Sequence, residues 1–131
     1  GIRKVTLTRI ALAGQERGHV ADMALEIVAG LADVPQNGTL AIERHGEKIV
    51  LARSEIGVFA LENRCTHAYQ ELHGGKVKKG FIFCPLHGLR VDLRNGCPSG
   101  NLTDKPVKAW HCEVQGEHIA IDLDRRLDPG D

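Results

Sequence analysis

Short runs of apolar residues, separated by polar turn residues and glycines, follow one another along most of the chain. Residues 39–44 and 48–53 are two such runs, and His45-Gly46-Glu47 between them is a turn, which predicts a β-hairpin. Strands that recur every 8–12 residues or so, with glycine turns between them, are typical of small antiparallel sheets. The pattern therefore predicts an all-β fold, a small antiparallel sandwich or barrel. Further strands are expected at residues 58–61, 81–83, 90–93, 109–114 and 118–123.

The N-terminal part of the pattern is less uniform. Residues 2–10 alternate between apolar and polar side chains, which predicts a short strand. In residues 20–31 apolar positions recur at helical spacing, yet Leu25, Ile27 and Ala29 also alternate as they would in a strand. The pattern alone leaves helix and strand open for this segment.

Composition limits the classes of function. The chain has 131 residues, the size of one domain, and its 17 Lys and Arg residues are balanced by 17 Asp and Glu residues. This balance argues against a strongly basic nucleic-acid-binding face. No apolar run is long enough to cross a membrane, and no export signal follows the first residues, so we expect a cytoplasmic protein. Four cysteines are too few for a disulfide scaffold, and in a reducing compartment they are expected to be ligands, catalysts or core residues.

Two cysteine–histidine pairs stand out in the middle of the chain. They are Cys65-Thr66-His67 and Cys84-Pro85-Leu86-His87, with 16 residues between His67 and Cys84. Each pair follows a predicted strand, so two loops at one end of a sheet can present four ligands to one metal centre. Two thiolates and two imidazoles suit tetrahedral zinc, and they also suit a [2Fe–2S] cluster. Zinc sites usually bracket the metal with like ligands, whereas each loop here supplies one of each kind, which favours the cluster.

The spacing C-x-H followed by C-x-x-H resembles the signature of the Rieske family. Gly88 after the second histidine fits the same signature, and Pro98 is similar to the third loop of that family, which closes over the cluster. The resemblance covers roughly residues 25–123 and implies a Rieske-like domain there, with a cluster-binding subdomain at about residues 63–100 and a strand at residues 25–29. It also implies one [2Fe–2S] cluster, with Cys65 and Cys84 on one iron and His67 and His87 on the other. Residues 1–24 then form an N-terminal extension without an assigned role, and residues 124–131 form a C-terminal tail.

Departures from the family pattern indicate the branch. High-potential Rieske proteins carry a further cysteine in each loop, and these two cysteines form a disulfide bridge. They also carry a serine shortly after the second histidine. The loops here read Ala68-Tyr69-Gln70 and Pro85-Leu86, with no cysteine, and Gly88-Leu89 follows His87 in place of a nearby serine. A missing bridge and a missing hydroxyl donor predict a potential near the lower end of the Rieske range of roughly −150 to +300 mV.

The remaining cysteine, histidine and lysine residues have less specific surroundings. Cys97 and Cys112 are expected to be free thiols, because a bridge between them is disfavoured in a reducing compartment. His73 lies six residues after His67, beside two glycines, and is expected to be an exposed loop residue. A short basic run in the same region is either a solvated hairpin or a surface that steers a redox partner; it consists of Lys76, Lys78 and Lys79.

These features predict a one-electron carrier without substrate chemistry of its own. The resemblance implies transfer from an NAD(P)H-dependent flavoprotein reductase to the terminal component of an aromatic-ring-hydroxylating dioxygenase. The chain has no G-x-G-x-x-G nucleotide fingerprint, and it is short for a terminal oxygenase. We therefore expect a monomer that meets both partners transiently and binds neither nucleic acid nor membrane. The alternatives are the Rieske-like small subunit of a larger enzyme such as assimilatory nitrite reductase, and a zinc-stabilised interaction module.

Overall fold

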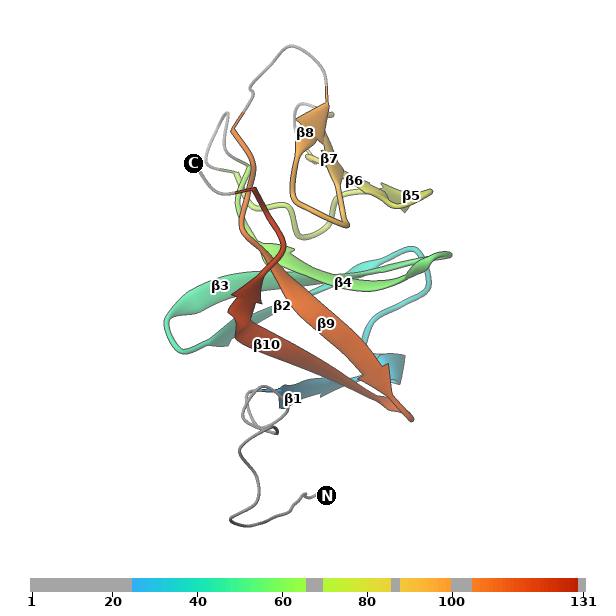
Figure 1. Cartoon of the computed structure of the whole chain (residues 1–131). Coiled ribbons are helices and arrows are strands. Elements are labelled where there is room, and N and C mark those ends of the chain that lie inside the picture. Colours follow the sequence, from blue (N-terminus) through green and yellow to red (C-terminus); the bar gives the residue numbers. More distant parts are fainter. Residues whose placement is uncertain (1–24, 66–69, 86–87, 100–104, 130–131) are drawn as a thin grey trace.

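Two antiparallel sheets make up the fold in the computed structural model, which describes residues 25–65, 70–85, 88–99 and 105–129. The larger sheet has six strands in the order β1-β10-β9-β4-β3-β2 and curls into a near-barrel (Figure 1). A second sheet, in the order β5-β6-β7-β8, lies on one side of it. The all-β prediction is therefore confirmed.

The observed strands agree closely with the predicted ones. The large sheet consists of β1 (Glu26–Gly30), β2 (Thr39–Arg44), β3 (Glu47–Ser54), β4 (Gly57–Glu62), β9 (Ala109–Gln115) and β10 (His118–Arg126). The small sheet consists of β5 (Val77–Lys78), β6 (Phe81–Phe83), β7 (Arg90–Asp92) and β8 (Pro98–Ser99). A single 3-10 turn, η2 (Leu31–Asp33), follows β1 in the described part of the chain.

The ambiguous segment before the first turn is a strand where the structure describes it. β1 begins at Glu26 and pairs with β10, with a register shift between Ile27 and Ala29. The residues before Leu25, and with them the strand expected at residues 2–10, lie outside the described residues.

β3 is buried on both of its faces, and this joins the two sheets. Ile49 and Leu51 belong to the core inside the near-barrel, whereas Val50 and Ala52 belong to a second core beneath the small sheet. Because side chains alternate across a strand, a continuous apolar run is what a strand between two cores requires. The second core also contains Cys65, so the loops that follow β4 and β6 are anchored on β3.

The tip of the β5–β6 hairpin is bound to the turn between β3 and β4. Lys79 and Gly80 form this tip and both have positive φ angles, of 53° and 83°, as a two-residue hairpin turn requires. The Gly80 N–H donates to the buried Ser54 hydroxyl at 3.1 Å, and the Lys79 N–H donates to the Glu55 carboxylate at 3.1 and 3.2 Å. Hydrogen bonds from the backbone of Glu55, from the Ser54 hydroxyl and from the Lys79 N–H lower the pKa of Glu55. The small sheet is thus fixed to the large sheet at two places: at the tip of the β5–β6 hairpin, and through the core that it shares with β3.

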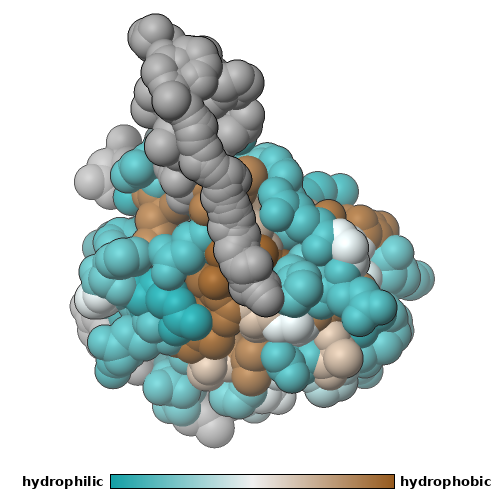
Figure 2. Space-filling model, turned by 90° about the horizontal axis from the view of Figure 1, so that it is seen from below, coloured by the Kyte–Doolittle hydropathy of each residue, from teal (hydrophilic) through white to brown (hydrophobic). Residues whose placement is uncertain are grey.

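The face of the near-barrel opposite the small sheet has a mixed surface. Figure 2 shows this side from below, with a brown apolar strip between teal hydrophilic regions. Among the described residues, Ile27 of β1 and Val114 of β9 are large apolar side chains that are nearly half exposed. In the described part of the chain, no helix has the length and apolar character needed to span a membrane.

Candidate metal centre

Both cysteines of the predicted ligand set are buried in the core beneath the small sheet. Cys65 lies three residues after the end of β4, and Cys84 directly follows β6. Their exposed fractions are 0% and 2%, and both belong to the buried cluster that includes Leu72 and Leu89. The two loops therefore enter one buried core, as expected, but they come from two different sheets and not from one end of a single sheet.

Each cysteine loop is closed by a backbone hydrogen bond of the same type. The Cys65 N–H donates to the Gln70 carbonyl at 2.5 Å, and the Cys84 N–H donates to the Leu89 carbonyl at 2.8 Å. In each loop the cysteine N–H thus reaches the carbonyl five residues later, so the ends of both loops are held together. In the second loop the Gly88 N–H also donates to the Cys84 carbonyl, with φ of 69° at Gly88. Positive φ is readily adopted by glycine, which explains the residue that follows the second predicted histidine.

The segment before Pro98 is held against Val107 by a close backbone approach. Gly96 has φ of 74°, and a Cβ at this position would lie 2.2 Å from the Val107 carbonyl oxygen. The Val107 N–H donates to the Gly96 carbonyl at 2.9 Å, and the Gly96 N–H donates to the Asp92 carbonyl at 2.8 Å. Only glycine fits this contact, and it fixes the position of β8, which contains Pro98.

Of the four predicted ligands, the structure describes the two cysteines. His67 and His87 lie outside the described residues. Within the described residues no three His, Cys, Asp or Glu side chains gather closely enough to hold a metal ion. The described half of the donor set is two buried cysteines, with the predicted histidines two residues after Cys65 and three residues after Cys84.

The remaining cysteines are free thiols, as predicted from the sequence. Cys97 is half-buried, and its N–H donates to the Asn95 side chain at 3.0 Å. Cys112 is half-buried beside the near-barrel core. Burial and, secondarily, the nearby Glu113 carboxylate raise the pKa of Cys112 to about 12, so this thiol is protonated at neutral pH.

His73 is exposed, as predicted, but it takes part in a network that the sequence does not reveal. Its N–H donates to the side-chain oxygen of the buried Asn63 at 2.9 Å, and its Nδ1 lies 2.9 Å from the Thr39 hydroxyl. The Gly74 N–H donates to the same hydroxyl at 3.0 Å. These bonds tie the segment after the first cysteine loop to β2, and no motif marks Thr39 or Asn63 as partners.

The fold and the cysteine loops define a class of protein. The model of the Rieske [2Fe-2S] domain matches residues 25–111, which include both cysteine–histidine pairs, and the chain belongs to this family. The family's cofactor is one [2Fe–2S] cluster of the Rieske type.

Known relatives include ferredoxins and a larger enzyme. The chain is 27% identical to the ferredoxin component of a naphthalene 1,2-dioxygenase system of Pseudomonas aeruginosa, over 71% of this chain and 89% of the ferredoxin. The ferredoxin of carbazole 1,9a-dioxygenase from Nocardioides aromaticivorans superposes with a TM-score of 0.67 at 31% identity, over 74% of this chain and 95% of that one. The chain is also 30% identical to the methylxanthine N3-demethylase NdmB of Pseudomonas putida, over 74% of this chain but 30% of the demethylase.

The described residues fit such a cluster. Cys65 and Cys84 are buried together and can supply two thiolates from loops of matching closure. Thiolates held in a dry core are shielded from solvent, which is one of the factors that set the potential of an iron–sulfur centre.

Proposed function

We propose that the chain is a one-electron carrier whose Rieske cluster is held by Cys65 and Cys84 on one iron and by His67 and His87 on the other. The observation that carries the proposal is the burial of the two cysteines in one core. Each cysteine begins a loop, and both loops are closed by the same type of backbone hydrogen bond. Each loop carries its histidine at the family's spacing. When bound, the cluster supplies a site that accepts and releases one electron.

The chain's own residues have three tasks in this function. Cys65 and Cys84 hold the buried side of the site and keep water away from it. The loop-closing backbone bonds to Gln70 and Leu89 fix the direction in which each cysteine enters the core. Contacts between the small sheet and β3 place both cysteines in the same buried core.

For the partners, we propose an NAD(P)H-dependent flavoprotein reductase as donor and a terminal oxygenase as acceptor, both bound transiently by a monomer. This assignment is supported by the relatives that are ferredoxin components of dioxygenase systems and that this chain matches over most of their length. A carrier of this kind has no bond-making chemistry of its own. We also propose a cytoplasmic location, where free thiols such as those of Cys97 and Cys112 stay reduced.

Spectroscopy and reconstitution test this function together. Iron and acid-labile sulfide should each be present at about two per chain, and the reduced protein should give a Rieske EPR signal. Cys84→Ser and His87→Ala should abolish that signal and electron transfer from reductase to oxygenase, while the matched Cys97→Ser variant should keep both. A colourless protein that holds zinc, or unchanged turnover when this protein is left out, would contradict the proposal.

A second candidate is a Rieske unit fixed within a larger oxidoreductase, either as a domain or as a small subunit such as that of assimilatory nitrite reductase. The observation in its favour is the demethylase relative, of which this chain spans 30%. Purification from the native source separates the two candidates. A stable stoichiometric complex would support the fixed unit, and a free monomer that shuttles electrons would support the carrier.

A further inference from the structure

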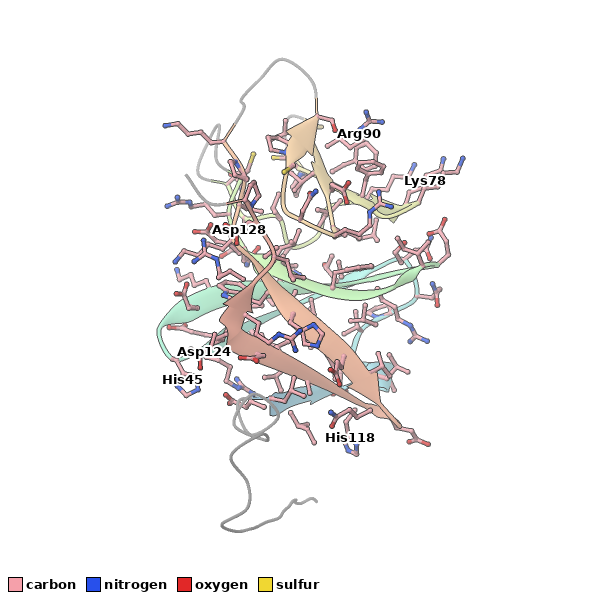
Figure 3. The ribbon with its side chains drawn as sticks, viewed as in Figure 1. His45, Lys78, Arg90, His118, Asp124 and Asp128 are labelled. Carbon is pink, nitrogen blue, oxygen red and sulfur yellow. The ribbon has the colours of Figure 1, made fainter. Side chains whose placement is uncertain are left out.

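The small sheet has an outer face that is turned away from the large sheet. Lys78, Phe81 and Asp92 are direct cross-strand neighbours on β5, β6 and β7, so their side chains point to the same side. Residues at the alternate positions, such as Ile82, are buried in the core against β3. Figure 3 shows Lys78 and Arg90 pointing from this sheet away from the near-barrel.

An aromatic ring lies among cations on this face. The Arg90 guanidinium carbon is 4.8 Å from the centroid of the Phe81 ring, and that of Arg94 is 6.0 Å away. Arg94 is held in place by Asp92, with Nε to Oδ1 at 2.9 Å and Nη2 to Oδ2 at 3.2 Å. Burial acts to raise the pKa of Asp92, but the hydrogen bonds from Arg94 outweigh it, so the pKa is lowered and the carboxylate stays charged. Arginine and half-buried aromatic side chains are enriched in protein interfaces, where the planar guanidinium offers several oriented donors.

The charge of this face differs from that of the whole chain. Residues 76–94 contain five basic residues and one acidic residue, Asp92, although the chain as a whole has 17 of each kind. The neighbouring Glu55 adds one carboxylate at the hairpin tip. Cations therefore exceed carboxylates here, and the rest of the chain has the opposite excess. We call this surface the basic face; its cations, all exposed, are Lys76, Lys78, Lys79, Arg90 and Arg94.

The basic face is continuous with the metal centre. Phe83 and Arg90 are cross-strand neighbours, and Phe83 directly precedes Cys84. A molecule bound to Arg90 and Phe83 would thus contact the residue next to a proposed ligand. A partner docked here would be close to Cys84, so an electron would travel only a short distance between the partner and the site.

We propose that the basic face is a docking surface for a redox-partner protein whose complementary surface is rich in Asp and Glu. The inference deepens the proposed electron-carrier function and rests on it. Opposite charges speed the encounter of transient partners and orient them, and they do so more strongly at low ionic strength. The balanced overall charge argues against nucleic acid as the occupant, because binding to phosphate backbones relies on a larger surplus of cations.

Binding of an acidic probe tests the surface itself. A fluorescently labelled poly-glutamate peptide should bind the full, cluster-loaded chain at low salt. Affinity should fall about tenfold in Lys78→Gln/Arg90→Gln, because two of the face's cations are removed. The matched variant Lys48→Gln/Arg125→Gln removes two exposed cations elsewhere and should bind as the unmodified protein does. Equal loss in both variants, absence of binding, or equal displacement by oligothymidine would overturn the proposal.

Kinetics connect the surface to electron transfer. In the reconstituted system, the rate of transfer with at least one partner should fall about tenfold in Lys78→Gln/Arg90→Gln at low salt and converge with the unmodified rate at high salt. Equal rates for both variants in a system that turns over would disprove docking at the basic face while the carrier function stands. Selective peptide binding in a chain that passes no electrons would instead disprove the carrier function and leave the surface intact.

Discussion

Gly75 lies directly against the backbone of Phe83, so closely that a Cβ on Gly75 would be 2.0 Å from the Phe83 carbonyl oxygen. The Gly75 N–H donates to the Leu72 carbonyl at 2.9 Å, and the next residue, Lys76, accepts the Phe83 N–H at 2.9 Å. This contact joins the segment after the first cysteine loop to the residue that precedes Cys84. The distance between the segment that follows the Cys65 loop and the segment that precedes Cys84 therefore depends on Gly75 having no side chain.

Gly75→Ala is expected to force these two segments apart. Backbone atoms cannot move aside as a flexible side chain can, so the free energy of unfolding should fall by about 2–3 kcal/mol, and the cluster content should fall with it. Urea unfolding and iron per chain measure the two effects. Gly74→Ala is the matched control, because φ is 89° there but no atom lies within 4 Å of the added Cβ. It should cost about 1 kcal/mol and leave the iron content unchanged; equal losses in both variants would contradict the argument.

Ser54→Ala should loosen the hairpin tip from the large sheet. The substitution removes the acceptor of the buried Gly80 N–H, and an unsatisfied buried donor costs about 1–2 kcal/mol of the free energy of unfolding. Denaturant unfolding and hydrogen exchange at Gly80 measure the change. Glu55→Gln is the control, since its side-chain oxygen still accepts the Lys79 N–H; a Ser54→Ala variant as stable as this control would disprove the role of the hydroxyl.

The sequence predicted the elements that carry a strong local signal and missed those that do not. Short apolar or alternating segments bounded by turn residues predicted β2, β3, β4, β6, β7, β9 and β10, with boundaries within a few residues. β5 and β8 have two residues each, too few to show a period, and they exist because neighbouring strands supply their partners. For the segment that forms β1, the apolar pattern was compatible with both helix and strand. In the structure this segment is a strand because it pairs with β10.

The proposed site shows the same division. Cys65 and Cys84 could be selected from the sequence because ligand chemistry requires fixed residue types at fixed spacing. The contact of Thr39 with His73 could not be predicted, because it joins residues 34 positions apart that match no motif. Which residues position a loop depends on the three-dimensional arrangement of the chain, and many residue types can serve at such positions.

Cys112 is expected to resist alkylation in the folded protein. Burial and the Glu113 carboxylate raise its pKa to about 12, so at pH 8 only about one thiol in ten thousand is the reactive thiolate. Iodoacetamide treatment followed by peptide mass spectrometry should find Cys112 unmodified in the native protein and modified after denaturation. The Cys112→Ser variant, which should keep its cluster, assigns the peptide. Rapid native modification at pH 8 would show that the thiol is more accessible than the structure indicates.

The pairing of Asp128 with Arg126 should make stability depend on pH in the acid range. Hydrogen bonds from the Arg126 guanidinium, and from the Ala109 N–H at 3.0 Å, lower the pKa of Asp128 from 3.8 to about 2 against the opposing effect of burial. The ionised form is therefore favoured by folding. A folded-state pKa below the unfolded one contributes stability that is fully present above about pH 4 and is lost as the pH falls from about 4 toward 2.

Asp128→Asn should accordingly lower the free energy of unfolding by about 2 kcal/mol at pH 7, the equivalent of the pKa difference. The difference between the variant and the unmodified protein should stay constant from pH 7 to about pH 5 and shrink below pH 4. Thermal or urea unfolding of both proteins over this range measures it. Asp124→Asn, in an exposed position nearby, should change stability little at any pH. A difference that persists undiminished near pH 2 would mean that Asp128 stabilises the fold through packing of its side chain and not through its charge.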